Sequence, residues 1–276
     1  MRRIWCYLLA LCALLLLCGC RSKVEEPILE MVSLDVGQGS ATLLRTPKGD
    51  ILVDTGGEGS QDELCRKLEN LGVARLELLV LSHPDEDHLG GADVILERFE
   101  TARVWVNGET SATESYARFA RAVYEKGVSV TVVRGGDGIS LGGVHLSVLA
   151  PLSGESGGDH EKCLVLLVRC ASFGALIMGD ADEGVERELM EAYGVAHLDV
   201  DVLCVGHHGS NDACSQPFLE ASSPQYAVIS CGAGNMYGHP DGRTLARLRD
   251  AEVLRTDLEG DIAFSVFDDG FVYQKK

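Results

Sequence analysis

The fold of this chain is decided by Ser82-His83-Pro84-Asp85-Glu86-Asp87-His88-Leu89-Gly90-Gly91. An apolar run at residues 76–81 precedes this stretch and predicts a buried strand. A loop after a strand has no side-chain periodicity, so it can direct several side chains toward one point. Side chains that can bind a metal ion lie close together in it, at His83, Asp85, Asp87 and His88. The alternative is an acidic surface turn with two incidental histidines, but His-x-Asp-x-Asp-His between strand and helix favours a metal loop.

The stretch resembles the metal loop of the metallo-β-lactamase superfamily, in particular the branch with ComEC-type competence proteins and phosphorylcholine esterases. The commonest loop of the superfamily is His-x-His-x-Asp-His, and Asp85 stands here at the second histidine. Other matching motifs lie in the expected order: Asp35-Val36-Gly37-Gln38-Gly39, Val53-Asp54-Thr55-Gly56, Met178-Gly179-Asp180, Gly206-His207-His208-Gly209-Ser210 and Gly238-His239-Pro240. The resemblance covers about residues 31–270. It implies an α/β fold, a single-domain four-layer αββα sandwich.

The resemblance also implies a dinuclear metal centre. Asp180 would bridge two divalent ions, and Gly179 before it would let the chain turn sharply. Asp54, at the end of a predicted buried strand, would support the metal loop by hydrogen bonding. The proposed ligands are His83, Asp85, Asp87, His88, His160, Asp180 and His207.

Three assignments keep an alternative. His207 is preferred over His208 as a ligand, and His208 remains a candidate for a ligand or a phosphate contact. His160 lies where ComEC-like sequences usually carry a different pattern, and it is either a ligand or an exposed histidine. His239 is a proton donor or substrate contact, or else only a helix-entry residue. The candidate catalytic residues are Asp87, His208 and His239.

Apolar periodicity and turn residues predict alternating strands and helices. Ser111 and Glu114 form a capping box that predicts a helix reaching Glu125. Other helices are expected over residues 61–71, 90–99, 183–192 and 242–250. Strands are expected over residues 103–106, 128–133, 163–169, 175–178, 200–205 and 226–230.

The expected ligands suit two divalent ions, because up to three carboxylates offset most of a +4 charge. Zinc matches the imidazoles, and the extra carboxylate also admits manganese. Such a pair lowers the pKa of coordinated water from about 15.7 toward about 7 and clamps the oxygens of an in-line displacement. The sequence therefore predicts a metal-dependent hydrolase, specifically a phosphodiesterase. The alternatives are a lactone or thioester hydrolase and a non-catalytic envelope-binding lipoprotein.

The substrate stays open between extracellular DNA and an envelope phosphodiester such as a choline- or polyol-phosphate. The ComEC-like motifs favour DNA. The formal net charge of −18 disfavours it, because phosphate backbones are bound by lysine and arginine. No motif points to a protein partner.

Residues 1–20 are expected to be a targeting segment, because two arginines precede an apolar core too short for a comfortable membrane span. Leu17-Cys18-Gly19-Cys20 resembles a lipobox, with Cys20 as the acylated residue. An uncleaved anchor or an ordinary signal peptide is the alternative. Residues 21–28 would be a tether and residues 29–276 the hydrolase domain. We therefore expect an extracytoplasmic lipoprotein anchored in the membrane.

Overall fold

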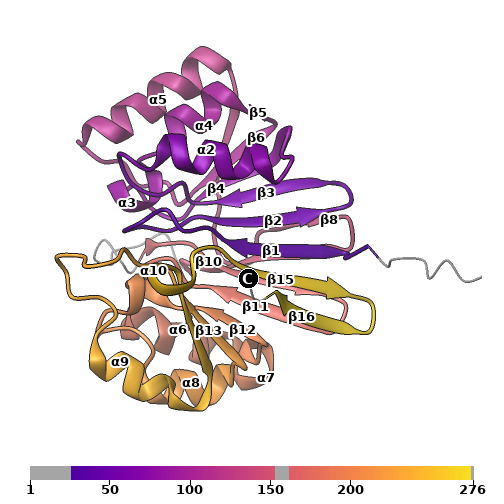
Figure 1. The fold of residues 1–276 in the computed structure, drawn as a ribbon, viewed down its shortest axis with the longest axis vertical. Helices are drawn as coiled ribbons and strands as arrows, with labels where there is room; N and C mark the ends of the chain where they lie inside the picture. The colour runs from indigo at the N-terminus through magenta and orange to yellow at the C-terminus, as the bar shows by residue number, and fades with distance from the viewer. Residues whose placement is uncertain (1–25, 153–161, 275–276) are drawn as a thin grey trace, which may run out of the picture.

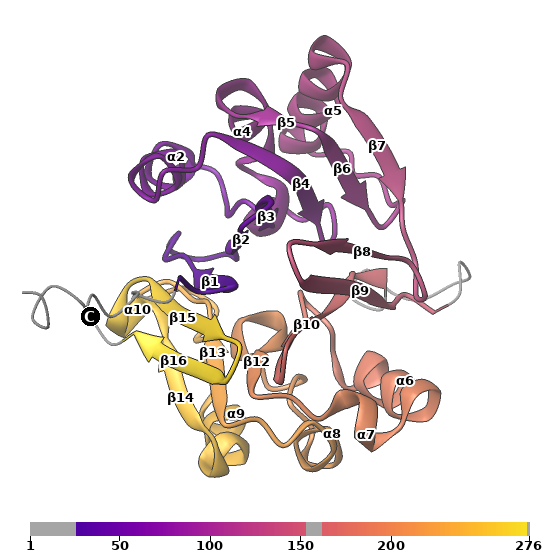
Figure 2. The same cartoon turned by 90° about the vertical axis from the view of Figure 1, so that its right-hand side faces the viewer.

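Two β-sheets face each other across the centre of the molecule, and helices cover the outer face of each sheet (Figure 1). The computed structural model describes residues 26–152 and 162–274. The predicted four-layer αββα sandwich is confirmed. Viewed from the side, the N-terminal half of the chain forms most of one sheet-and-helix pair, and the C-terminal half forms most of the other (Figure 2).

Within the described residues the first sheet has nine strands, in the order β16-β15-β1-β2-β3-β4-β6-β7, with β5 beside β4. The last two strands of the chain therefore complete the sheet begun by the first. From β3 to β7 neighbouring strands run parallel, and the remaining pairs are antiparallel. Its strands are β1 (Leu29–Ser33), β2 (Thr42–Thr46), β3 (Gly49–Val53), β4 (Arg75–Leu81), β5 (Glu100–Thr101), β6 (Arg103–Val106), β7 (Ser129–Val132), β15 (Ile262–Phe267) and β16 (Gly270–Gln274).

The second sheet has seven strands in the described part of the chain, in the order β14-β13-β12-β11-β10-β9-β8. Strands β11 to β14 are parallel, so their carboxyl ends lie at one edge of the sheet. Its strands are β8 (Gly138–Leu141), β9 (Val144–Ala150), β10 (Val165–Cys170), β11 (Phe173–Ile177), β12 (Val202–Cys204), β13 (Tyr226–Ile229) and β14 (Glu252–Arg255).

Most of the helices divide into two outer layers, as Figure 1 shows. Those of the first layer are α2 (Gln61–Asn70), α3 (Glu86–Leu89), α4 (Ala92–Arg98) and α5 (Glu114–Lys126). Those on the side of the second sheet are α6 (Glu183–Tyr193), α7 (Val195–Leu198), α8 (Gln216–Ser222) and α9 (Gly242–Arg247), with short 3₁₀ turns at η2 (Gly206–Gly209) and η3 (Leu248–Asp250). Helix α10 (Thr256–Glu259) follows β14 and lies at the ends of the sheets rather than in an outer layer.

Strand β4 shows why an almost continuous apolar run forms the centre of this fold. Its alternate residues Leu78 and Val80 pack between the two sheets. Leu79 and Leu81 point the other way and pack against the helices. Successive strand residues face opposite sides of a sheet, and here both sides are buried, so both must be apolar.

Two of the predicted helices differ from the structure at their ends. Thr113, not Ser111, caps α5, because its Oγ1 accepts a hydrogen bond from the Tyr116 amide. The helix predicted over residues 90–99 is α4, which begins at Ala92 and ends at Arg98, and a separate short helix, α3, precedes it and ends at Leu89. At Gly91 a Cβ would lie 2.5 Å from the Thr55 carbonyl oxygen, so the loop with the predicted metal ligands passes very close to the backbone after β3.

The predicted lipobox, its Cys20 and residues 21–25 of the tether lie outside the described residues. Among the residues that are described, no helix is long and apolar enough to cross a membrane. The described cysteines are all free, and most are buried, as expected of small core residues.

Candidate metal centre

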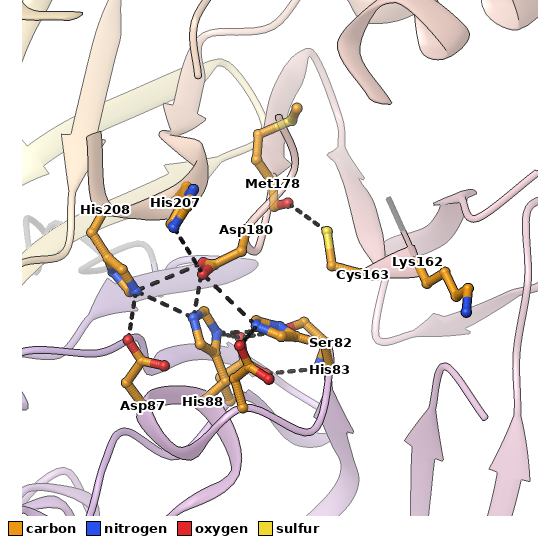
Figure 3. Close-up of polar contacts among 12 residues, drawn as sticks. Ser82, His83, Asp87, His88, Lys162, Cys163, Met178, Asp180, His207 and His208 are labelled. Atoms are coloured by element: carbon orange, nitrogen blue, oxygen red, sulfur yellow. Dashed lines mark hydrogen bonds and ion pairs between the residues drawn. The ribbon is translucent and has the colours of Figure 1, made fainter. Parts of the chain in front are cut away.

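The candidate site lies where strands of both sheets end. The loop with His83 and His88 follows β4, the Asp180 loop follows β11, and the two adjacent histidines follow β12. Parallel pairing of β11 with β12 aligns Ile177 with Cys204, so the loops after these strands start side by side. Figure 3 shows the side chains from the three loops pointing toward one another.

Asp54 holds the predicted metal loop in place through hydrogen bonds. Its Oδ1 accepts the Ser82 amide at 2.7 Å, and its Oδ2 accepts the Ser82 hydroxyl at 2.8 Å. The same Oδ2 lies 2.8 Å from Nδ1 of His88. Since Asp54 is only 1% exposed, these contacts are shielded from water. A buried carboxylate that receives a histidine N–H fixes the tautomer and the orientation of the ring.

The Nδ1 atoms of His88 and His208 both make hydrogen bonds, so the Nε2 atoms of these rings face the candidate metal centre. Nδ1 of His208 donates to the Ser230 carbonyl at 2.9 Å, just as Nδ1 of His88 faces Asp54. In the neutral rings each Nε2 then carries a lone pair, and the two Nε2 atoms are 3.3 Å apart. A cation at this point, either a proton on His88 or a metal ion, would satisfy the two nitrogens and the carboxylates beside them. The residues present therefore fit a divalent metal ion.

The carboxylates complete two groups of candidate ligands that share His88. One group is His83, His88 and Asp180, and the other is Asp87, His88 and His208, with ligand atoms in each group within 4.8 Å of one another. Asp180 Oδ1 is 2.9 Å from Nε2 of His88 and 3.7 Å from Nε2 of His208, and Asp180 Oδ2 is 3.8 Å from Nε2 of His83. Asp180 thus faces both groups, as a bridging ligand would.

The electrostatics of the centre favour a positive charge. Burial opposes ionisation of Asp180, yet the histidines around it, His88 above all, hold the pKa of this carboxyl well below its ordinary value. Burial likewise opposes a charge on His88, but Asp180 and Asp54 hold its pKa well above the usual range. The negative environment that attracts a proton to His88 would equally attract a metal ion.

Comparison with known proteins agrees with this geometry. Residues 34–233 match the family described as the metallo-beta-lactamase superfamily. The chain belongs to this superfamily. Its members are generally metal-dependent hydrolases, and the fold often holds two divalent ions.

Proteins named as competence proteins are among the relatives of this chain. The chain is 34% identical over 261 residues to competence protein ComA of Neisseria gonorrhoeae, covering 92% of this chain and 35% of that protein. It is 29% identical over 255 residues to ComE operon protein 3 of Bacillus subtilis, covering 85% of this chain and 33% of that protein. The chain therefore spans about a third of the length of these relatives.

Among solved structures, the metallo-beta-lactamase fold protein YhfI of Bacillus subtilis superposes with a TM-score of 0.56 at 12% identity. The match covers 89% of this chain and 99% of that one, and it shows the fold alone.

The metallo-β-lactamase fold brings most of the predicted site residues together, but with different partners for the two adjacent histidines. His208 joins Asp87 and His88, with its Nε2 3.1 Å from Oδ2 of Asp87. His207 lies farther out, with its Nε2 3.9 Å from Oδ2 of Asp180. The geometry therefore points to His208 rather than the preferred His207 as the ligand in the second group.

The backbone of both residues is left-handed, with φ of 48° at His207 and 51° at His208. Such a conformation costs on the order of 1–3 kcal/mol for each residue that is not glycine. Nδ1 of His207 lies 3.2 Å from Oδ1 of Asp212, a partner that sequence reasoning missed. No motif singled out Asp212, which lies in a polar loop after the histidines.

The remaining predicted residues lie at the periphery or outside the described chain. Oδ2 of Asp85 is 3.6 Å from Nε2 of His83, so it can reach the first group. The His239 ring lies 5.7 Å from that of His207, centroid to centroid. Burial and the neighbouring His207 and His208 lower the pKa of His239, so it is neutral at neutral pH. His160 lies outside the described residues.

Cys163, close to the candidate site, is a structural residue. It is fully buried, and its Sγ contacts the Met178 carbonyl oxygen at 3.5 Å. Burial raises the pKa of this thiol well above its usual value, which excludes it as a nucleophile.

A cavity of about 570 Å³ adjoins the metal centre. Its lining includes four carboxylates and two exposed large side chains, which are Glu58, Asp85, Glu86, Asp87, Met236 and Tyr237. Among the described residues that line it there is no lysine or arginine, although Arg118 pairs with Glu58. Asp85 and Asp87 thus belong both to the candidate metal loop and to the acidic wall of this cavity.

Proposed function

We propose that this chain is a metal-dependent phosphodiesterase. The observation that carries the proposal is the shared ligand set, in which His88 belongs to both groups and Asp180 faces both. Bound divalent ions would activate water and neutralise the charge of a phosphoryl group. A centre with several carboxylates suits hard phosphate oxygens.

Other residues of the chain would orient the metal ligands and contact the substrate. Asp54 orients His88, and the Ser230 carbonyl orients His208. His239, neutral and beside His207, would serve as a substrate contact rather than as a proton donor, because a neutral imidazole has no readily released proton. Its loop is held by Asn235, whose amide nitrogen donates to the His239 carbonyl and whose Oδ1 accepts the His239 amide.

Two phosphodiester substrates are supported by different observations. The names of the relatives, which include competence and recombination proteins, support DNA. The acidic wall of the 570 Å³ cavity and the net charge of −18 support a phosphodiester with a neutral or cationic substituent, such as a choline-phosphate of the envelope. We further propose that lipid on Cys20 anchors the protein on the outer side of a membrane.

The deciding experiment is a metal assay of the mature protein combined with hydrolysis of bis(p-nitrophenyl) phosphate in added zinc or manganese. Metal-dependent turnover supports the proposal. Bound metal without turnover of this ester, or of a lactone or thioester, would instead identify a non-catalytic binding protein. Parallel assays with single-stranded DNA and p-nitrophenyl phosphorylcholine then separate the two substrates.

Asp85→His should shift the metal preference of the enzyme. The change replaces an anionic oxygen with a neutral nitrogen beside His83, which suits zinc better than manganese. We expect metal to be retained, while manganese-supported turnover falls about tenfold more than zinc-supported turnover, consistent with the 10- to 100-fold effects of changes around metal sites. Metal content and turnover with each ion measure this. Unchanged occupancy and unchanged preference in both Asp85→His and Asp85→Ala would show that Asp85 is not a ligand.

A further inference from the structure

The loop from Gly209 to Ser215, which directly follows His208, is held by a buried carboxylate. Glu186 on α6 is 1% exposed. Its Oε1 accepts the Cys214 amide at 2.6 Å, and its Oε2 accepts the Ser215 amide at 2.8 Å. Both oxygens of this side chain are therefore used to fix the far end of the loop.

Arg247 on α9 binds the same loop through its carbonyl groups. Its Nε donates to the Cys214 carbonyl at 2.7 Å, and its Nη2 donates to the carbonyls of Asn211 at 2.8 Å and Ala213 at 2.7 Å. A guanidinium has several donors in a fixed planar arrangement, so one side chain can hold several carbonyls at once.

The remaining carbonyls of the loop are bound as well. The Asp241 amide donates to Gly209, the Thr244 hydroxyl to Ser210, and the Glu183 amide to Asp212. Every carbonyl from Gly209 to Cys214 thus accepts a hydrogen bond from α6 or from residues 241–247. The carbonyls of this loop are therefore all bound, although the loop is not part of a strand or a long helix.

The position of this loop matters for the metal centre. It starts at the left-handed turn of His207 and His208, a single 3₁₀ turn in which the Ser210 amide donates to the His207 carbonyl. It also carries Asp212, whose Oδ1 is 3.2 Å from Nδ1 of His207. A shift of the loop would move His208 away from Asp87.

We propose that Glu186 and Arg247 are positioning residues, which hold the loop of residues 209–215 in the conformation that aims His208 at the metal centre. This inference rests on the proposed role of His208 as a ligand. Neither residue touches the reacting groups.

The ionic character of Glu186 supports a role beyond packing. Burial raises the pKa of Glu186 to about 7, although the hydrogen bonds from Ser215 and Cys214 oppose the shift. Carrying this charge inside the protein therefore disfavours folding, and an apolar side chain would fill the space at lower cost. An apolar side chain could not accept the hydrogen bonds of the two amides that fix the loop.

The test is a cobalt titration of the full mature protein, followed by visible absorption in competition with a chelator. We expect Glu186→Gln and Arg247→Lys each to weaken the binding of at least one ion about tenfold, because groups that orient metal ligands typically contribute that much to affinity. The matched controls are Glu188→Gln on α6 and Arg249→Lys on η3, which change exposed side chains and should leave both affinities unchanged. Melting temperatures are recorded for all four variants.

Lower melting temperatures with unchanged cobalt affinities and spectra would overturn the proposal, because the two residues would then serve stability alone. If Glu186→Gln fails to fold, Arg247→Lys, which keeps the charge and most of the side chain, decides the question. A wild-type protein that binds cobalt but hydrolyses no phosphodiester would contradict the proposed activity, and this titration would still decide the positioning role. A wild-type protein that binds no cobalt would contradict both.

Discussion

Asp180→Asn should remove most of the bound metal and lower phosphodiester turnover by at least about a hundredfold. Residues that only orient metal ligands contribute about 10- to 100-fold, and the loss of a ligand that serves two ions should exceed this. Asp180 lies 2.9 Å from Nε2 of His88, which belongs to both groups, and 3.7 Å from Nε2 of His208 in the second group, so its carboxylate faces both groups. Asparagine keeps the shape but removes the charge and one oxygen. Mass spectrometry of bound metal and bis(p-nitrophenyl) phosphate hydrolysis measure the effect.

Asp182→Asn provides the matched control two residues away. Asp182 caps α6 by accepting the amides of Gly184 at 2.8 Å and Val185 at 3.2 Å. Asparagine caps helices about as well as aspartate, so stability, metal content and turnover should all stay near the wild-type values. Equal behaviour of the two variants would show that Asp180 is not a ligand.

His208→Ala should be far more damaging than His207→Ala. The first change removes an Nε2 that lies 3.1 Å from Asp87 and 3.3 Å from His88, and we expect a loss of at least about a hundredfold in turnover together with part of the metal. The second removes a ring that is 3.9 Å from Asp180 and paired with Asp212, and we expect a loss of about tenfold with metal retained.

Each variant is the natural control for the other, since the two residues are adjacent and share the same backbone conformation. Metal content and turnover, measured side by side, distinguish them. If His207→Ala loses the metal and His208→Ala keeps it, the preference for His207 that the sequence suggested is correct, and the assignment from geometry is wrong.

The layers of the fold could be predicted because their causes are local. The apolar run of β4 and the turn signals around it are readable along the chain, and β6 was predicted with its observed ends, Arg103–Val106. Helix α8 was missed, since its seven residues, Gln216–Ser222, are too few for a clear period. The cap of α5 was misplaced by two residues because Ser111 and Thr113 are both good capping residues.

The candidate site was only partly predictable for a different reason. Asp54 was expected to support the metal loop by hydrogen bonding because it ends a buried strand, and the structure shows such a contact with His88. The choice between His207 and His208 depends on left-handed backbone angles that no pattern in the sequence reports. Glu186 and Arg247 act on a loop 28 to 36 residues away along the chain, and such contacts exist only in three dimensions.

The two halves of the chain meet at the metal centre, and this makes the ions a thermodynamic link between them. His88 and His208 are 120 residues apart in sequence, and each belongs to a different sheet-and-helix layer. An ion bound to both binds only the folded state, so free metal at 1,000 times its dissociation constant adds about 4 kcal/mol to the free energy of unfolding. Chelation should therefore weaken the contact between the two halves first. The rate at which a protease cleaves the chain would then depend on the concentration of free metal around it.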